Sequence, residues 1–264
     1  MLSKLMKYEI KATARIFLPL YALIIPMSLL TKVFLHSTAD SFEIPRMITM
    51  SVYVILIVAL FVMTLIVTIQ RFYRNLLGDE GYLSFTLPVK THTHIDAKLL
   101  VTFMWVVIST LIAALSIFIL AADGQTMAQL GRWWVRDVSP FFAKYGAQVW
   151  ICVFEVIILM LVSTLCQTAE IYAAITVGNL SSKHKLIAGI GAYIGFGVVM
   201  QTISSLLVEM FKPYFESFFQ ASHLDSPFPA MNYILLIILL GELIYLGIFY
   251  FLTEWLLSRK RNLE

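Results

Sequence analysis

The sequence predicts an all-α membrane protein with six transmembrane helices. Three observations lead to this prediction: an apolar composition, six long apolar runs, and short connections between the runs. Apolar residues make up 60% of the 264 residues and charged residues 13%, whereas soluble domains average about 45–50% and about 25%. The mean hydropathy is +0.86. So much apolar surface does not fit inside one soluble core, and the bilayer is the expected solvent.

Each of the six apolar runs is long enough to cross the hydrocarbon core, which takes about 20 helical residues. They cover approximately residues 16–36, 47–69, 98–121, 147–172, 186–208 and 231–257. No linker or low-complexity stretch separates them. Residues 1–264 are therefore expected to form a single membrane domain.

The distribution of Lys and Arg predicts that both termini lie in the cytoplasm, because cytoplasmic loops carry an excess of these residues. An even number of spans agrees with this placement. With the N-terminus inside, only six of the 19 Lys and Arg residues fall on the outer side: Lys32, Arg46, Arg132, Arg136, Lys144 and Lys212. The N-terminus lacks a short apolar core followed by a small-residue cleavage site, so we expect it to belong to the mature protein.

Residues 1–15 are expected to form an amphipathic helix ahead of the first span. At helical spacing, one face carries apolar residues and the other carries basic ones: Leu2, Leu5, Met6, Ile10 and Thr13 against Lys4, Lys7, Lys11 and Arg15. Such a helix lies in the headgroup layer with its basic side chains reaching outward. It serves either as a simple anchor or as a contact with a cytoplasmic partner.

The inner segment between the second and third spans, residues 71–100, is the most informative connection. Residues 78–81 form a turn-prone break that contains Asp79 and Glu80. Apolar side chains then follow before Pro88: Tyr82, Leu83, Phe85 and Leu87. A solvated loop has no need of such a cluster. The segment therefore either folds back on the membrane surface or docks into another protein.

Three ionisable residues inside the apolar runs are candidate functional residues: Lys32, Glu155 and Glu242. Within a membrane such residues are costly, and they face the protein interior or a water-filled path. Glu242 lies near the middle of the sixth run, where an acid costs about +3 kcal/mol. The surrounding Leu, Ile and Phe residues offset that cost. The three residues either have structural roles, with Lys32 paired to one of the acids, or mark a translocation path.

The fifth run contains a G-x-x-x-G pair, Gly191 and Gly195, which lets two helices approach closely. The partner is either a helix of the same chain or a second copy.

Two outer segments are aromatic. Trp133 and Trp134 suit the membrane interface, and the aromatic residues within 211–219 form either an interfacial belt or an exit surface for apolar cargo.

Motifs of catalytic and nucleotide-binding sites are absent from the sequence. It has no G-x-x-x-x-G-K-[ST] loop, no H-E-x-x-H pair and no G-x-S-x-G elbow. The five His residues form no metal set, and the basic residues are scattered at a net charge of +3, so no nucleic-acid-binding patch is expected. Cys152 and Cys166 lie too far apart on one predicted helix to form a disulfide. We therefore expect no catalytic residue, metal or cofactor in this chain.

The run RFYRNLLGDEGYLSFTLPV at 71–89, with KLL opening the third span, resembles the small permease subunits of ABC-2 type exporters of Gram-positive bacteria. The inner turn EIYAAITVGNLSSKHK at 170–185 fits the same group. Within this group the sequence is most similar to permeases that export phenol-soluble modulins, which are short amphipathic peptide toxins. The resemblance covers the six-span layout, and its specific part is limited to these two inner segments.

This resemblance implies a permease that works with other chains in a bacterial cell membrane. Two permease copies, as a homodimer or with a sister permease, would pair with two separate ATPase subunits that bind ATP and Mg²⁺. The N-terminal helix would also touch the ATPase. The inner segment would carry a coupling helix that docks in a groove of the ATPase through Leu76, Leu77, Asp79, Glu80, Tyr82, Leu83, Phe85 and Leu87.

Three alternative functions remain. The chain resembles a toxin-secreting permease, but an antibiotic or bacteriocin efflux and immunity permease has the same features. A membrane enzyme that uses Glu155 or Glu242 is a second alternative, and a non-transporting anchor or sensor is a third. The apolar cluster within residues 82–87 distinguishes among them, since an enzyme or an anchor has little need for a docking surface.

Overall fold

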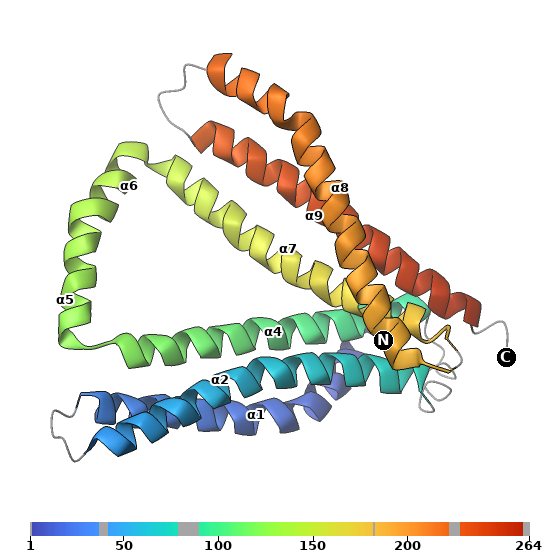
Figure 1. Ribbon diagram of the computed structural model, residues 1–264, viewed down its shortest axis with the longest axis horizontal. Coiled ribbons are helices and arrows are strands. Elements are labelled where there is room, and N and C mark those ends of the chain that lie inside the picture. Colours follow the sequence, from blue (N-terminus) through green and yellow to red (C-terminus); the bar gives the residue numbers. More distant parts are fainter. Residues whose placement is uncertain (1, 37–41, 79–89, 182, 222–227, 261–264) are drawn as a thin grey trace. The chain divides into compact units, whose positions relative to one another are not determined.

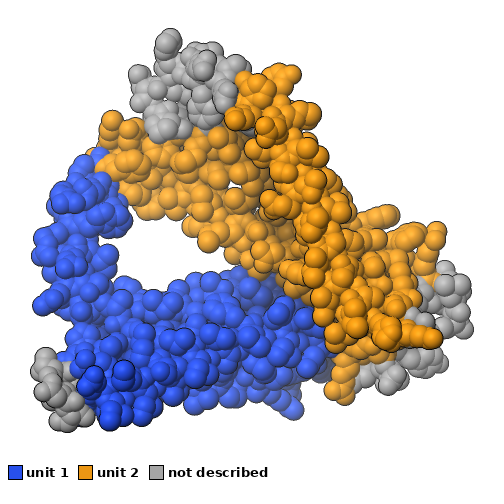
Figure 2. Space-filling view, in the orientation of Figure 1, with its two compact units in different colours: residues 1–71, 92–140 blue, residues 72–91, 141–264 orange. Residues whose placement is uncertain are grey.

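The computed structural model describes residues 2–36, 42–78, 90–181, 183–221 and 228–260. These residues are almost entirely helical and include no strand. They form two compact units: residues 1–71 with 92–140 (unit 1), and residues 72–91 with 141–264 (unit 2) (Figure 2).

Six long helices confirm the predicted spans (Figure 1). Each contains a stretch that is long and apolar enough to cross a membrane. These helices are α1 (Leu2–Leu35), α2 (Glu43–Phe72), α4 (Thr91–Ala121), α7 (Ala147–Gly178), α8 (Lys185–Ala221) and α9 (Phe228–Lys260). Helices are expected here because every backbone polar group must find a partner within the protein when the surroundings are hydrocarbon.

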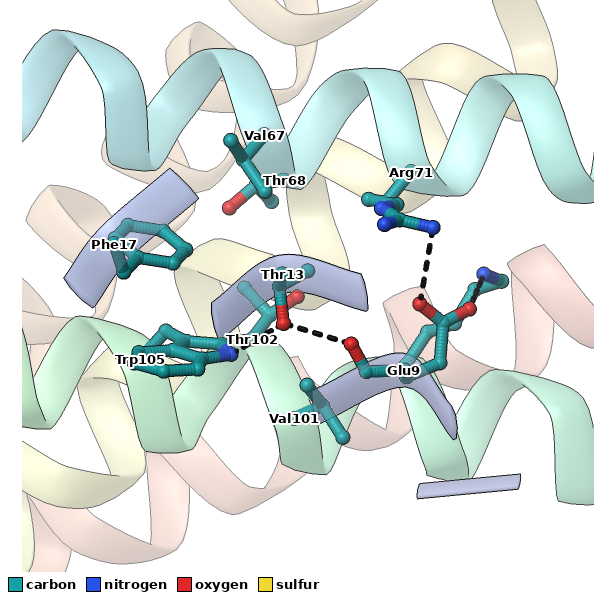
Figure 3. Close-up of a pocket in the computed structure, with 10 residues that line it drawn as sticks. Glu9, Thr13, Phe17, Val67, Thr68, Arg71, Val101, Thr102 and Trp105 are labelled. Atoms are coloured by element: carbon teal, nitrogen blue, oxygen red, sulfur yellow. Dashed lines mark hydrogen bonds and ion pairs between the residues drawn. The ribbon is translucent and has the colours of Figure 1, made fainter. Parts of the chain in front are cut away.

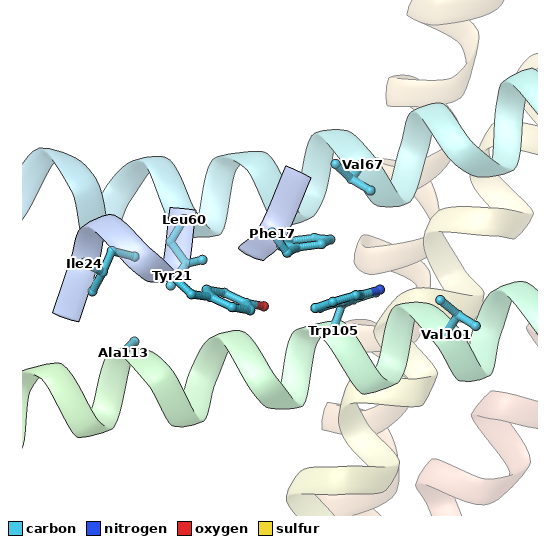
Figure 4. Close-up of a cluster of buried hydrophobic side chains, with 8 residues drawn as sticks. All are labelled: Phe17, Tyr21, Ile24, Leu60, Val67, Val101, Trp105 and Ala113. Carbon is cyan, nitrogen blue, oxygen red and sulfur yellow. The ribbon is translucent and has the colours of Figure 1, made fainter. Parts of the chain in front are cut away.

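The core of unit 1 is built by α1, α2 and α4. Phe17 of α1 stacks on Trp105 of α4 with ring centroids 4.7 Å apart and an interplanar angle of 16°. The buried apolar cluster consists of Phe17, Tyr21, Ile24, Leu60, Val67, Val101, Trp105 and Ala113 (Figure 4). Close packing of this kind is a main force between helices in a membrane, where apolar side chains gain little by leaving lipid.

Hydroxyl groups also join the three helices of unit 1. The Tyr21 hydroxyl lies 2.8 Å from Ser109 Oγ, and the Tyr53 hydroxyl lies 3.0 Å from Ser116 Oγ. Each pair satisfies polar atoms that hydrocarbon cannot satisfy. The first pair links α1 to α4, and the second links α2 to α4.

Buried threonines recur in both units, and they bond to their own helices. Thr64 and Thr68 of α2 donate to the carbonyl oxygens of Leu60 and Thr64 at 2.7 and 2.8 Å. Thr176 and Thr253 in unit 2 do the same with the carbonyl four residues earlier, each at 2.7 Å. This intrahelical bond is the common way for a threonine to satisfy its hydroxyl inside an apolar helix.

The N-terminal segment differs from the separate interfacial helix that we expected. Residues 2–15 continue into the span as one helix, α1, although Pro19 and Pro26 lie inside it. The predicted basic face is exposed. The apolar face is not left to the lipid, however, because Met6 and Ile10 pack against the unit 1 core. No helix-breaking residue stands between Arg15 and the apolar run, which explains the continuity.

Unit 2 depends on close contact between α7 and its neighbours α8 and α9. The C-terminal half of α7 carries small side chains, and Ala169, Ala173 and Gly178 are all buried. At the end of α7 the backbone of Gly178 nearly touches that of Gly189 in α8, since a Cβ on Gly178 would lie 2.5 Å from the Gly189 Cα. Phe72, the last residue of α2, stacks on Tyr172 with centroids 4.0 Å apart.

The connection between α4 and α7 is helical, which the sequence analysis did not predict. It comprises α5 (Gly124–Trp133), a wider π-helical turn η3 (Trp134–Val138) and α6 (Ser139–Tyr145). The Asp123 side chain caps α5 by accepting the Thr126 backbone N–H, an arrangement typical of helix starts. Gly146 separates α6 from α7 at φ +54°, a conformation that residues with a side chain rarely adopt.

We predict that Gly178→Ala lowers the stability of the protein. The added methyl group meets backbone atoms of Gly189 and the Lys185 carbonyl oxygen, at 2.5 and 2.8 Å, which cannot move aside as a side chain can. Overpacking of this kind costs about 1–3 kcal/mol. Thermal unfolding in detergent measures the loss. Gly247→Ala in α9 is the matched control, because a Cβ there has no neighbour within 4 Å, and an equal effect of both changes would contradict the close contact.

Candidate functional site

One carboxylate, that of Glu9 in α1, is shared by cations from two other helices of unit 1 (Figure 3). Lys98 near the start of α4 forms an ion pair and hydrogen bond with Glu9 Oε1. Arg71, next to the last residue of α2, lies 3.8 Å from Glu9 Oε2. The side chains of Lys98 and Glu9 are only 7% and 15% exposed. We call these three residues the Glu9 cluster.

A hydrogen-bonded pair lies one turn further along α1. Trp105 Nε1 donates to Thr13 Oγ1 at 2.7 Å, and Thr13 Oγ1 in turn donates to the Glu9 carbonyl oxygen at 2.8 Å. The tryptophan thereby connects α4 to the same turn of α1 that carries the Glu9 side chain. Both atoms of the pair are buried, so the connection is shielded from competing water.

A small cavity lies beside the Glu9 cluster, lined by the cluster together with side chains such as Thr68, Thr102 and Trp105 (Figure 3). Its volume is about 20 Å³, which has room for roughly one water molecule. No substrate of useful size fits there. The arrangement is therefore suited to holding α1, α2 and α4 together at one end, rather than to chemistry on a bound molecule.

The energetic character of the Glu9 cluster follows from its burial. Removing a charge from water is costly, and a buried pair repays that cost only when both partners are present. The loss of one partner leaves the other charge stranded in a medium of low polarity. The Glu9 cluster therefore resists partial opening, and a rearrangement that separates α1 from the C-terminal end of α2 and the N-terminal part of α4 has to provide new partners for these charges.

Sequence reasoning missed Glu9 as a site residue and counted Arg71 and Lys98 only as inner positive charges. A signal was present. Glu9 follows Leu2, Leu5 and Met6 at helical spacing and precedes Thr13 by one turn, so it lies on the buried face of α1. An acid on the apolar face of a helix needs a cationic partner on a neighbouring element. That partner is 89 residues away in the sequence.

The predicted polar residues of unit 2 lie along the contact between α7 and α9. In the amide orientation that satisfies its hydrogen bonds, Asn232 of α9 donates to Glu155 Oε2 at 3.3 Å. Cys166 Sγ donates to the backbone carbonyl oxygen of Glu242 at 3.1 Å. These contacts give Glu155 and the Glu242 backbone partners on the facing helix.

A further acid, Glu170, completes this row and was not predicted as a site residue. It is buried in α7, and its carboxyl group lies beside the hydroxyl of Tyr245 in α9. The contacts advance along both helices in the same order, from Glu155 and Asn232 to Glu170 and Tyr245. The two helices therefore run in the same direction, as they must if α7, α8 and α9 are successive spans.

Lys32 has a partner within unit 1. Its Nζ donates to the Ala122 carbonyl oxygen at 2.6 Å, directly after the end of α4. A cation is favourable at this position, because the last carbonyl groups of a helix are unpaired and carry partial negative charge. The amino group of Lys32 therefore has a polar partner without the ion pair to Glu155 or Glu242 that the sequence suggested.

In the part of unit 2 that the structure describes, the G-x-x-x-G pair makes no close helix contact. Gly191 and Gly195 are exposed, and a Cβ built on either one has no neighbour within 4 Å. The helix contact that does need glycine is made by Gly178 and Gly189 instead. Both alternatives for Gly191 and Gly195, another helix of the same chain or a second copy, stay predictions.

Most of the predicted docking residues of the inner segment lie outside the described residues: Asp79, Glu80, Tyr82, Leu83, Phe85 and Leu87. Leu76 and Leu77 are described, in the π-helical turn η2 (Tyr73–Leu77). Leu76 is buried, so its side chain packs within the protein and offers little surface for docking. Leu77 is half-buried.

Comparison of the chain with protein-family models, with curated proteins and with solved structures finds no match. Among the residues that the structure describes, no three metal-ligating side chains gather in one place. Function is therefore inferred from the six-helix fold, the Glu9 cluster and the sequence of the inner segment.

We predict that Glu9→Gln destabilises the protein, because Lys98 and Arg71 lose the carboxylate that they share. Breaking a fully buried pair costs about 3–5 kcal/mol, and the partial exposure of this cluster lowers the expected loss to about 2 kcal/mol. Thermal unfolding in detergent provides the measurement. Asp137→Asn is the control, since it breaks an exposed ion pair with Arg136 that contributes at most about 1 kcal/mol.

A double-mutant cycle with Lys98→Met tests whether the effect arises from the pair itself. If the charge of Lys98 loses stabilisation when Glu9 is replaced, then the double variant loses less stability than the sum of the losses in the two single variants. Strictly additive losses in unfolding temperature would show that the Glu9 and Lys98 side chains do not stabilise each other.

Proposed function

We propose that this chain is the membrane-spanning permease subunit of an ATP-driven exporter, with ATP hydrolysed by a separate ATPase subunit. The observation that carries the proposal is the Glu9 cluster. Arg71 and Lys98 lie at the two ends of the inner segment, and both are joined to α1 through one carboxylate. A partner that pulls on this segment therefore acts on three membrane helices together.

The inner segment supplies the docking surface in this proposal. Its sequence resembles the coupling segment of ABC-2 type exporter permeases, and the apolar residues within 82–87 are suited to a notch of the ATPase. Asp79 and Glu80 supply acidic contacts for basic residues of that partner. The chain has no phosphate-binding loop of its own, in keeping with a division of labour between a permease and an ATPase.

The proposed mechanism needs no bond-making chemistry in this chain. Binding of ATP closes two ATPase subunits on each other, and the docked inner segments move with them. Because Glu9 joins α1 to the inner ends of α2 and α4, this movement is transmitted to the three helices as a group. Inward-open and outward-open arrangements then alternate, with ATP supplying the differential binding energy.

An amphipathic peptide is the cargo that the proposal favours. Such peptides partition into the membrane interface, because one face is apolar and the other is polar. Phe211 and Tyr214 lie near the far end of α8 from the inner turn, and both are exposed. This aromatic surface suits an apolar cargo face as it leaves the membrane path.

The proposed assembly contains a second permease copy, and α8 is the helix that supports this part of the proposal. The spanning stretch of α8 buries none of its residues within the chain. It presents Gly191 and Gly195 with open space beside them, which allows the close approach of another helix. The proposal keeps both termini in the cytoplasm, as the Lys and Arg distribution predicts, and the bacterial cell membrane is what the family resemblance implies.

A membrane enzyme that uses Glu155 or Glu242 is a weaker explanation of the same structure. Glu155 is hydrogen-bonded to Asn232 across the α7–α9 contact. A catalytic carboxyl group needs space for a substrate next to it. The contact with the facing helix accounts for Glu155 as a structural residue.

We predict that an ATP-binding subunit is recovered in equal amount when the chain is purified in mild detergent from its native membranes. Replacing Tyr82, Leu83 and Phe85 by Ser is expected to remove that subunit, because the docking surface loses its apolar side chains. Mass spectrometry and gel densitometry measure the ratio. Recovery of the chain alone from fresh membranes in several detergents would contradict the proposed function.

A matched control for the docking variant is Ser substitution at Val33, Ile44 and Met47. These apolar residues are 67%, 70% and 64% exposed, and they lie near the opposite ends of α1 and α2 from the Glu9 cluster. The change in composition is similar, but the ATPase is expected to stay bound. Loss of the ATPase in both variants would indicate general destabilisation rather than a docking surface.

We further predict that Glu9→Gln lowers the number of peptides exported per ATP hydrolysed, while the ATPase stays bound. The inner segment still docks, but its movement no longer reaches α1. Parallel assays of peptide uptake into inverted vesicles and of phosphate release provide the ratio. The exchanged pair Glu9→Lys with Lys98→Glu keeps opposite charges in contact, and it is expected to recover part of the ratio. An unchanged ratio in Glu9→Gln would exclude this role for Glu9.

A further inference from the structure

The helical segment Gly124–Val138 of unit 1, formed by α5 and η3, is not part of the Glu9 cluster. We infer that this segment lies flat on the membrane surface at the ends of the spans, with its apolar side inserted in the phospholipid leaflet. We call it the surface helix. This inference does not depend on the exporter proposal, since it follows from the fold of unit 1 alone.

The first argument is the direction of the surface helix. Only Ala122 and Asp123 separate it from α4, and Figure 1 shows that α5 turns sharply across the line of α4. Because α4 is a candidate membrane span, a helix that crosses its end runs along the membrane surface. The segment also has to return the chain toward the next span, α7, without entering the hydrocarbon as a loop.

Several contacts hold the corner between α4 and α5 in place. Lys32 Nζ donates to the Ala122 carbonyl oxygen at 2.6 Å, and His36 Nε2 lies 3.5 Å from Asp123 Oδ2. Hydrogen bonds from Thr126 hold the pKa of Asp123 below its ordinary value, so the cap stays charged near neutral pH. The corner is thereby joined to the end of α1, and the direction of α5 is a fixed feature of unit 1.

The second argument is the pattern of side chains. Met127, Leu130, Trp134 and Val138 recur every three or four residues and so share one side of the helix. The opposite side carries Gln125, Gln129, Arg132 and Arg136. α5 buries none of its residues in the chain, and Leu130 on the apolar side is 44% exposed. Part of the apolar side of the surface helix is therefore open to the surroundings of the chain.

The third argument is that the chemistry of this surface fits a phospholipid leaflet. Trp133 and Trp134 have an apolar ring and a polar N–H, the combination that is enriched at membrane interfaces. Arg132 and Arg136 have long apolar stems that let their charges reach headgroup phosphates. The surface helix also begins where a span ends, which places it at the depth of the headgroups.

Insertion of apolar side chains, rather than charge, is the expected main source of binding. Arg136 forms an ion pair with Asp137, with Arg136 Nη2 and Asp137 Oδ2 2.9 Å apart, so these two charges largely cancel. Only Arg132 then adds attraction to anionic headgroups. The apolar side of such a helix typically lies about 5–10 Å below the headgroups.

Cysteine scanning of the surface helix tests this inference in the full-length protein. Single Cys substitutions are made at Met127, Leu130 and Trp134 on one side, and at Gln125, Gln129 and Arg132 on the other. The protein is reconstituted in mixed orientation into phosphatidylcholine–phosphatidylglycerol liposomes, and the rate of reaction with a membrane-impermeant maleimide is measured. Wild-type protein measures the background, which is expected to be low because Cys152 and Cys166 are buried.

The inference requires that positions on the apolar side react at least about tenfold more slowly than positions on the polar side, since they lie below the headgroups. Equal, fast reaction on both sides would overturn it and show a helix in water. The protection must also persist at a high lipid-to-protein ratio. Protection that disappears on dilution in lipid would identify a second copy as the partner, and protection seen only in native membranes would identify another protein; either result overturns the inference.

Quenching of Trp fluorescence by brominated phospholipid provides an independent measurement. Lipid-facing tryptophans in the surface helix are accessible to the bromine atoms, so Trp134→Phe is expected to lower the quenchable fraction of the emission. Trp105→Phe is the matched control, because Trp105 is buried in the core of unit 1 and contributes little quenchable emission. An equal quenchable fraction in wild-type and Trp134→Phe protein would contradict insertion of the surface helix.

Discussion

The carboxylate of Glu9 determines how the N-terminal part of α1, the C-terminal end of α2 and the N-terminal part of α4 are held together, because two cations from different helices share it. Apolar packing alone does not fix the position of one membrane helix along another, because an apolar side chain gains little free energy when it moves from lipid to protein. A charge cluster of this kind adds a fixed position, because separating buried opposite charges in an apolar setting is costly. The Trp105–Thr13 hydrogen bond and the Phe17–Trp105 stack then extend this fixed position into the core of unit 1.

The helices were predictable because a single local property, the length of an apolar run, is nearly sufficient to define a membrane span. The fourth span illustrates this, as its predicted start at residue 147 is the first residue of α7. The contacts between helices were not predictable in the same way. Glu9 and Lys98 are 89 residues apart, and the close glycine contact joins two helices through Gly178 and Gly189, so it forms no motif along the sequence.

Short helices on the surface were missed for a related reason. The connection between α4 and α7 contains no spanning run, and its only strong local signal is Asp123 ahead of a short amphipathic pattern. The separate N-terminal helix was predicted for the opposite reason, since its amphipathic pattern is clear. In the structure the same pattern belongs to the first turns of α1, whose apolar face packs against the core of unit 1. An amphipathic pattern predicts a buried face, but it does not distinguish a lipid partner from a protein partner.

The buried threonines make these spans less polar toward neighbouring helices than their sequence suggests. Where a threonine donates its only proton to a carbonyl oxygen of its own helix, as Thr68, Thr176 and Thr253 do, a neighbouring helix meets mainly a methyl group. Toward its surroundings such a residue has nearly the shape and character of valine. Thr13 differs, because its oxygen also accepts a hydrogen bond from Trp105. Thr31 and Thr64 likewise have a polar contact on a second helix. Exchange of threonine for valine in related chains would therefore have little effect at positions such as 68, 176 and 253, and a visible cost at position 13.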